Sequence, residues 1–378
     1  MVDIPVEPIP IATLPPDDPK KRSRVILLSV VVVLLGIFLL LFRFIPLQPS
    51  SSPSLLSKTV SSPTPFPFVE MTIPYLRARS YTSSLGQREL YSQGSSYTSY
   101  LSSYTSDGLK VNGLLTIPTG KPEDYGWPAS NALRSNAGWP AIVFIHGYLS
   151  PTLYVTTERY NDYVDYLARN GFVVFKIDLR GHGESEGQAG GGYFGSDYVV
   201  DALNARAALQ SADFVNKDKV GLWGHSMAGN IVMRSLAVKP EIPAAVIWAG
   251  AVYSYTDQRK YGINDQSYRP SGTPTQQNRR RSDLFQKVGS PSATSPFWRE
   301  VAPTNYLADL KGAIEVHHAL DDTVVNIGYS RDLVTLLDQT TVPHEFYTYP
   351  SGGHNLEGAS FTLAMQRTVE FFKKYLSP

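Results

Sequence analysis

The sequence predicts an α/β fold in which a mostly parallel central sheet is covered by helices on both faces, preceded by a single transmembrane helix. Two observations lead to this prediction. Over residues 96–376, short apolar runs alternate with longer amphipathic segments, as strands joined by helices do. Ahead of them, residues 25–45 form a long apolar stretch that follows a cluster of basic residues.

The apolar stretch at residues 25–45 is expected to anchor the chain in a membrane. A helix of about 18 apolar residues spans roughly 27 Å, close to the thickness of the hydrocarbon core of a bilayer. Four basic residues stand just before it: Lys20, Lys21, Arg22 and Arg24. Basic residues stay on the cytoplasmic side, so the rest of the chain is expected outside the cytoplasm. A cleaved signal peptide is the alternative, but its apolar core would be shorter and a small-residue cleavage site would follow.

The chain is therefore divided into four segments. Residues 1–24 form a cytoplasmic tail, residues 25–45 the anchor, residues 46–95 a Pro/Ser-rich linker and lead-in, and residues 96–378 the folded domain. Residues 251–304 interrupt the alternation of strands and helices and are rich in tyrosine. A connection this long is usually functional, which favours a lid-like insertion over a plain surface excursion.

The alternation also predicts individual elements. Strands are expected at 96–101, 109–117, 141–145, 172–178, 219–223, 244–249, 313–318 and 344–349. Helices are expected at about 157–170, 197–212, 227–238, 327–339 and 359–376. The Asp107-Gly108 pair predicts a hairpin turn between the first two strands.

Composition excludes several classes of function. The net charge is +1 and the basic residues form no long stripe, so nucleic acid is not an expected partner. The absence of cysteine excludes disulfides, thiolate metal sites and cysteine nucleophiles. No metal-binding cluster or phosphate-binding loop is visible, so neither a metal nor a cofactor is expected.

The segment with the clearest chemical meaning surrounds Ser226. An apolar strand runs through a turn of small residues directly into a helix, with the sequence Gly224-His225-Ser226-Met227-Ala228-Gly229. Such a turn exposes a serine hydroxyl at the carboxyl end of a sheet and requires small neighbours, because the strand and helix backbones come close together. The start of the helix also offers N–H groups to a developing negative charge. Ser226 is therefore the candidate nucleophile.

Residues 96–376 resemble the α/β-hydrolase superfamily, and within it the prolyl-oligopeptidase-like, dienelactone-hydrolase-related serine peptidases. The turn at Ser226 matches the family's G-x-S-x-G except that Ala228 replaces the last glycine. His146-Gly147-Tyr148 resembles the family's oxyanion loop, which implies that the backbone amides of Tyr148 and Met227 bind an oxyanion. Asp178-Leu179-Arg180-Gly181-His182-Gly183-Glu184-Ser185 resembles a loop with a structural role.

The same resemblance implies the acid and the base. The chain order of the family is serine, aspartate, histidine. The stretch from His317 to Val325 resembles the family's H-G-x-x-D-x-x-V-P, and this register makes Asp321 the acid, with Asp322 as the fallback. His354 follows the last expected strand in a glycine-rich loop and is the expected base.

The expected activity is that of a membrane-anchored serine hydrolase that cleaves acyl bonds, with a peptide or small acyl compound as substrate. The resemblance favours a peptidase. A carboxylesterase or lipase-like enzyme uses the same three residues and stays open as an alternative. A catalytically silent, ligand-binding hydrolase fold is a third possibility, disfavoured by the intact order of Ser226, Asp321 and His354.

Overall fold

The central sheet carries the architecture. The structure is a computed structural model, and it describes residues 67–127, 138–190, 192–264 and 276–377. Within these residues the sheet has nine strands in the order β1-β2-β3-β5-β4-β6-β7-β8-β9. The pairs β1·β2, β2·β3 and β3·β5 are antiparallel. The remaining pairs, from β5·β4 to β8·β9, are parallel. The α/β fold with a mostly parallel sheet is thus confirmed.

The expected strands are all present, with bounds shifted by a few residues. They are β2 (Tyr97–Ser106), β3 (Leu109–Pro118), β4 (Trp139–Ile145), β5 (Val173–Ile177), β6 (Val215–His225), β7 (Ala244–Trp248), β8 (Ala313–Ala319) and β9 (His344–Tyr349). β2 and β3 form the expected hairpin, with Ser106 opposite Leu109. Asp107 and Gly108 both have positive φ angles, 52° and 79°, as a type I′ turn requires.

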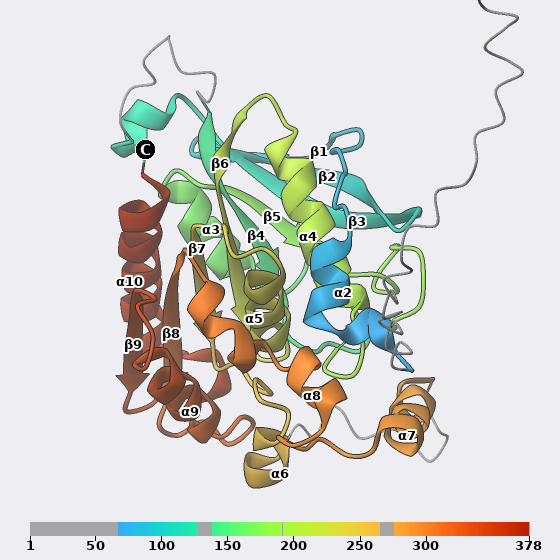
Figure 1. Cartoon of the computed structure of the whole chain (residues 1–378). Helices are drawn as coiled ribbons and strands as arrows, with labels where there is room; N and C mark the ends of the chain where they lie inside the picture. The colour runs from blue at the N-terminus through green and yellow to red at the C-terminus, as the bar shows by residue number, and fades with distance from the viewer. Residues whose placement is uncertain (1–66, 128–137, 191, 265–275, 378) are drawn as a thin grey trace, which may run out of the picture. The chain divides into compact units, whose positions relative to one another are not determined.

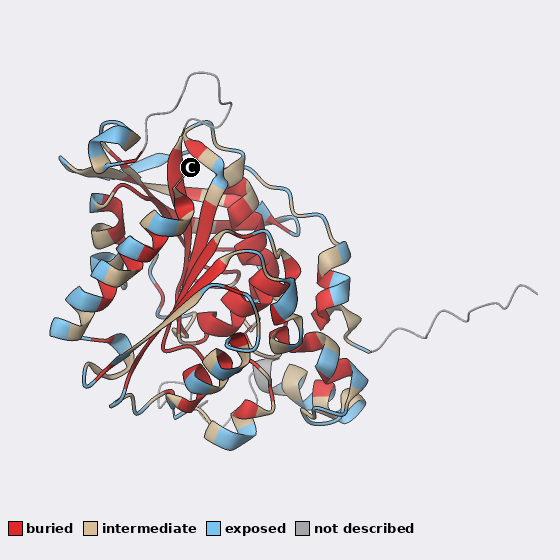
Figure 2. Ribbon diagram, turned by 60° about the vertical axis from the view of Figure 1, so that its left-hand side comes forward, coloured by how far each residue is buried: buried red, intermediate tan, exposed pale blue. Residues whose placement is uncertain are grey.

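Helices cover both faces of the sheet, as expected (Figure 1). On one face lie α3 (Asn161–Arg169) and α10 (Ala359–Leu376), which contact each other. On the other lie α4 (Asp197–Gln210) and α5 (Ala228–Val238), while α9 (Gly328–Leu337) contacts β8 and β9. Of the parallel strands between these layers, β4, β5, β7 and β8 are buried along their whole length, and buried strands fill the centre of Figure 2. Burial on both faces explains why they read as continuous apolar runs.

The folded domain begins before residue 96, the start expected from the sequence. Residues 67–95 contribute a short 3-10 helix (Val69–Met71), α2 (Ile73–Ala78) and the edge strand β1 (Glu89–Gln93). α2 packs against α5, and the buried guanidinium of Arg234 donates to the carbonyl of Met71 at 2.7 Å. A six-residue helix and an exposed edge strand are too short to show a clear hydrophobic period, so the sequence pattern did not reveal them.

The insertion at residues 251–304 contains helices rather than a bare loop. These are α6 (Asp257–Tyr261), α7 (Gln276–Val288) and α8 (Pro296–Val301), followed by a 3-10 helix (Pro303–Asp309). Figure 1 shows α6, α7 and α8 at the end of the sheet toward which the arrowheads of β8 and β9 point. The insertion therefore stands at the edge where parallel strands place their ligand sites.

The transmembrane helix expected at residues 25–45 lies outside the described residues. Over the part of the chain that the structure describes, no helix is both long enough and apolar enough to cross a membrane.

A buried ion pair ties the antiparallel and parallel parts of the domain together. The Arg180 guanidinium, in the loop after β5, donates to both carboxylate oxygens of Asp201 in α4, and Arg180 Nη2 lies 2.7 Å from Asp201 Oδ1. The Ser106 hydroxyl at the end of β2 donates to the same oxygen at 2.7 Å. The Asp201 side chain has no solvent exposure. Arg180 Nη2 also lies 3.2 Å from Oδ2 of the partly exposed Asp107, so Asp201 is the fully buried partner of the guanidinium. Removing Asp201 would leave this buried charge only partly compensated.

We expect Asp201→Ala to lower the free energy of unfolding by about 3 kcal/mol, because the buried Arg180 guanidinium would keep only the partly exposed Asp107 and Asp197 as counter-ions. Asp309→Ala is the matched control, since the pair of Asp309 with Arg77 is solvent-exposed; it should cost less than about 1 kcal/mol. Urea unfolding of the full-length protein measures both. Equal losses for the two variants would contradict the structural role given to the Arg180–Asp201 pair.

Candidate active site

The turn between β6 and α5 holds Ser226 in a strained conformation. Its φ angle is 55°, in the left-handed region that a serine seldom adopts. Its amide donates to the carbonyl of Trp248 at 2.9 Å, and its carbonyl accepts from the amide of Gly229 at 2.9 Å. The surrounding backbone thus fixes the strained residue from both sides. Strain of this kind concentrates at functional sites, and here it presents the hydroxyl at the carboxyl end of the sheet.

The glycines of the turn are required by close packing. A Cβ atom on Gly224 would lie 2.7 Å from a methyl group of Val232 and 3.0 Å from the Cβ of Ala228. A Cβ on Gly229 would lie 2.6 Å from the Cα of Gly250, in the turn after β7. Ala228 itself fits, so the departure from the family pattern leaves the turn intact.

His354 and Asp322 are joined by a hydrogen bond, as the expected base and its acid would be. His354 lies in a short 3-10 turn (Gly353–Asn355) after β9, and its Nδ1 is 2.8 Å from Oδ2 of Asp322. Asp321 instead accepts hydrogen bonds from the amides of Gly352 and Gly353, at 3.3 and 2.9 Å. The assignment of Asp321 as the partner of His354 is therefore wrong by one residue, and Asp322 occupies that position. Asp321 fixes the loop that carries the histidine.

The surroundings of Asp322 keep its carboxylate charged. One oxygen accepts from the amides of Val324 and Val325, at 2.8 and 2.9 Å. The other lies 3.2 Å from Nε2 of the buried His318, in addition to its bond with His354. Burial alone would raise the pKa of Asp322, but the hydrogen bonds from His318 and His354 outweigh it and hold the pKa well below its usual range. An ionised Asp322 can orient the imidazole and stabilise its protonated form.

A chain of hydrogen bonds, here called the Tyr160 relay, joins the loop after β4 to the loop that carries His354. The Gly147 amide donates to the Tyr160 hydroxyl at 3.0 Å. Tyr160 Oη is 2.8 Å from Nδ1 of His225, and Nε2 of His225 is 2.9 Å from the carbonyl of His354. A carbonyl can only accept, so Nε2 carries the proton and the Tyr160 hydroxyl donates to Nδ1. Burial lowers the pKa of His225 to about 3, which keeps the ring neutral as this arrangement needs.

The Tyr160 relay is held in place by its surroundings. Arg159 and Tyr160 have positive φ angles of 57° and 56°, and the buried Lys176 ammonium donates to the carbonyls of Glu158 and Arg159 at 2.7 and 2.8 Å. A Cβ on Gly147 would lie 2.9 Å from Tyr160 Oη, so only glycine fits there. The sequence pattern did not indicate Tyr160 or His225 as residues of the site. The single local signal was the position of His225 next to Ser226.

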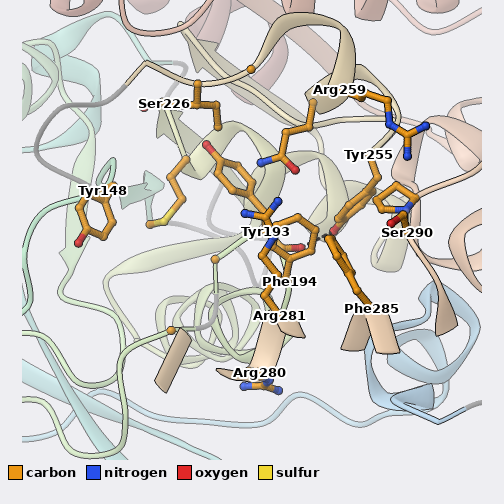
Figure 3. A pocket seen from close by; sticks show the side chains of 17 residues that line it. Tyr148, Tyr193, Phe194, Ser226, Tyr255, Arg259, Arg280, Arg281, Phe285 and Ser290 are labelled. Carbon is orange, nitrogen blue, oxygen red and sulfur yellow. Dashed lines mark hydrogen bonds between the residues drawn. The ribbon is translucent and has the colours of Figure 1, made fainter. Parts of the chain in front are cut away.

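Ser226 stands between two cavities. The histidine cavity, of about 720 Å³, is lined by Ser226, His354, His225 and Tyr160 among others. The arginine cavity, of about 540 Å³, lies on the insertion side and is lined by Ser226, Tyr148, Met227, Arg281 and residues of α6 and α7 (Figure 3). Tyr148 and Met227 line the arginine cavity together with Ser226, and their amides are the ones expected to bind an oxyanion. That role stays a prediction.

The loop from Asp178 to Ser185 is structural, as expected. The Asp178 carboxylate accepts from the hydroxyls of Tyr154 and Thr156, at 3.0 and 2.6 Å. The His182 ring packs against His146 and Tyr154, and burial lowers its pKa to about 3. His182 therefore supports the loop after β4 and does not face the Asp322–His354 pair.

The nine-stranded sheet, the strained serine between β6 and α5, and the aspartate–histidine pair on the loops after β8 and β9 define an α/β hydrolase of the serine type. Comparison with known proteins agrees with this class. Residues 140–267 match the model of a family described as serine aminopeptidase, S33.

Two relatives of known sequence indicate how broad the class is. The chain is 23% identical to an uncharacterized peptidase, YtmA, of Bacillus subtilis, over 68% of this chain and 85% of that protein. It is 28% identical to a protein named as a non-heme haloperoxidase in Mycobacterium phage D29, over 42% of this chain. The match spans 46% of the phage protein, less than half of its length.

Solved structures share the fold. An acetyl xylan esterase from Thermoanaerobacterium superposes with a TM-score of 0.52 at 18% identity, covering 79% of this chain and 90% of the esterase. A puromycin-hydrolyzing peptidase from Mycobacterium tuberculosis gives a TM-score of 0.56 at 17% identity, covering 75% of this chain and 40% of the peptidase. Identities this low show the α/β-hydrolase fold alone, and both kinds of hydrolase share it.

The acid can be identified by substitution. Asp322→Asn should lower kcat for p-nitrophenyl acetate by about 10⁴-fold, because the amide no longer stabilises the imidazolium or fixes its tautomer. Asp321→Asn should lower it by less than about tenfold, since an amide oxygen can still accept from Gly352 and Gly353. The reverse order of the two effects would restore Asp321 as the acid.

The Tyr160 relay predicts a loss of rate without a loss of binding. Tyr160→Phe leaves the Gly147 amide and His225 Nδ1 without their partner, which costs about 1–3 kcal/mol and should lower kcat by about 10–100-fold with little change in KM. Tyr163→Phe is the control, because the Tyr163 hydroxyl bonds only the exposed carbonyl of Asn355. Thermal unfolding of both variants is measured in parallel. A loss of stability with unchanged kcat would make the relay merely structural.

Proposed function

We propose that this protein is a membrane-anchored serine hydrolase that cleaves acyl bonds through an acyl-enzyme, and that its substrates are peptides. The observation that supports the proposal most directly is that Ser226 and His354 line one cavity at the carboxyl edge of the sheet, while Asp322 bonds the far nitrogen of His354. A strained serine, an imidazole and a buried carboxylate are the parts that activate a hydroxyl nucleophile.

In the proposed reaction, Ser226 Oγ attacks the acyl carbonyl carbon and its proton passes to Nε2 of His354. The carbonyl oxygen becomes an oxyanion, held by the amides of Tyr148 and Met227. The C–N or C–O bond then breaks, and the leaving group takes the proton from His354. In the second half, a water molecule gives a proton to His354 and attacks the acyl carbon. The bond from the acyl carbon to Ser226 Oγ then breaks, Oγ takes the proton back from His354, and the free acid leaves. Asp322 stabilises the imidazolium in both halves.

The peptidase reading rests on the family model for serine aminopeptidases and on the likeness to a peptidase of Bacillus subtilis over most of both chains. A carboxylesterase is the second candidate, since an acetyl xylan esterase shares the fold over 90% of its length. The same three residues serve both reactions, so the substrate decides between them.

The proposed location rests on the sequence. The apolar stretch at residues 25–45 and the basic residues before it favour a single-pass anchor with the N-terminus in the cytoplasm and the hydrolase domain outside it. Protease treatment of sealed cells tests this orientation: the domain should be cut in intact cells, whereas protection until the membrane is lysed would reverse it.

The nucleophile is tested with the full-length protein in detergent. Ser226→Ala should lose labelling by a fluorophosphonate and at least about a thousandfold of the hydrolysis rate, because the hydroxyl proposed to form the acyl-enzyme is removed. Persistent labelling would remove Ser226 from its role.

The substrate class follows from one comparison on the same preparation. Aminoacyl and Xaa-Pro p-nitroanilides are compared with short p-nitrophenyl esters as substrates. We expect wild-type protein to cleave the anilides and Ser226→Ala protein to leave them intact. If the esters alone turn over, the protein is a carboxylesterase. If neither class reacts and wild-type protein takes no fluorophosphonate, a ligand-binding hydrolase fold replaces the enzyme.

A further inference from the structure

The arginine cavity carries positive charge that the described residues do not balance. Three arginines line it: Arg259 in α6, and Arg280 and Arg281 in α7. No acidic side chain occurs among its described lining residues. Arg280 is neutralised by Asp197, 2.6 Å away, whereas Arg259 and Arg281 form no ion pair with any described residue. Like charges in one cleft repel each other and attract an anion, which makes the cavity selective for negative charge.

Arg281 is the arginine best placed to bind a ligand. Its guanidinium lies over the rings of Phe194 and Phe285, 4.8 and 5.2 Å from their centroids. Figure 3 shows it beside Phe194 within the cavity, while Arg280 lies apart. Aromatic contacts engage the faces of a guanidinium, and its N–H groups point along its edges. Those edges remain suited to a planar, bidentate acceptor such as a carboxylate.

The position of His354 decides which part of a substrate enters this cavity. The base must hand its proton to the leaving group, so the leaving group lies on the side of His354. His354 lines the histidine cavity and not the arginine cavity. The acyl part of the substrate therefore points the other way, past Tyr148 and Met227 toward Arg281. The apolar rings of Phe194, Phe285 and Tyr255 can cover its hydrocarbon portion.

We propose that the arginine cavity is an acyl-binding site for acids with a second, distal carboxylate, which Arg281 binds and Arg259 attracts at the cavity rim. The substrates are then amides or esters of such acids; in a peptide, the acidic side chain lies on the acyl side of the cleaved bond. This inference rests on the proposed function only for the direction of the acyl group.

Turnover of two matched esters tests the proposal with the full-length protein. p-Nitrophenyl octanoate and p-nitrophenyl hydrogen suberate share chain length and leaving group, and only the suberate carries a distal carboxylate. We expect kcat/KM to favour the suberate ester by about tenfold or more, as a charge-assisted pair provides. Added salt should reduce the preference. Arg281→Gln should bring the ratio close to one.

Arg279→Gln is the matched control, because it removes the same charge from an exposed position of α7 that does not line the cavity. It should leave the ratio unchanged. Equal turnover of the two esters by wild-type protein, or an equal loss of preference in Arg279→Gln, would overturn the inference.

Binding keeps the inference testable apart from catalysis. Ser226→Ala protein is titrated calorimetrically with both uncleaved esters. The suberate ester should bind more tightly, and adding Arg281→Gln, but not Arg279→Gln, should weaken it about tenfold. Equal affinity for the two esters overturns the inference whatever the turnover shows. Selective binding by a wild-type protein that hydrolyses neither ester would support the inference and overturn the proposed function alone.

Discussion

The structure of the site depends on one backbone constraint, the sharp turn that carries Ser226 from β6 into α5. The chain can reverse there only if Ser226 adopts a positive φ and if the backbones on either side come nearly into contact. The second condition restricts positions 224 and 229 to glycine, which has no side chain. A strained residue of this kind costs about 1–3 kcal/mol, which the surrounding sheet must supply. The Ser226 amide donates to the carbonyl of Trp248, the last residue of β7, so the strained residue is bonded directly to the sheet.

The other groups of the site reach Ser226 because parallel strands end at the same edge. Asp322 follows β8 and His354 follows β9. These strands are neighbours in the sheet, so both residues lie on adjacent loops at its carboxyl edge. Hydrogen bonds then fix the conformation of the loop that carries His354. Asp321 holds the glycines before His354, and the Tyr160 relay holds the carbonyl of His354 itself. Hydrogen bonds therefore fix the loop that carries His354 before a substrate binds. The site then needs little reorganisation during the reaction.

Much of this could be predicted from the sequence, and the failures have physical causes. Buried parallel strands and amphipathic helices leave strong periodic signals, and the small residues around Ser226 mark a turn that few folds use. Asp321 and Asp322 are adjacent acids at the end of a strand, and which one meets His354 depends on how the chain turns after β8. That turn is set by the amides of Val324 and Val325, which no pattern in the sequence identifies. Tyr160 joins the site only through tertiary packing, and the elements before residue 96 are too short to show a period.

The separation of the two cavities has a consequence for how this enzyme class can diversify. The groups proposed for the chemistry come from the ends of strands, where a changed side chain also disturbs the sheet. Arg259, Arg281 and Phe285 come from α6 and α7, short helices inserted between β7 and β8. Substitutions in these helices can therefore alter which compounds enter while the reacting groups keep their geometry. Substrate choice can therefore change during evolution with little effect on the catalytic residues. Selection can act on substrate choice and on catalytic rate separately.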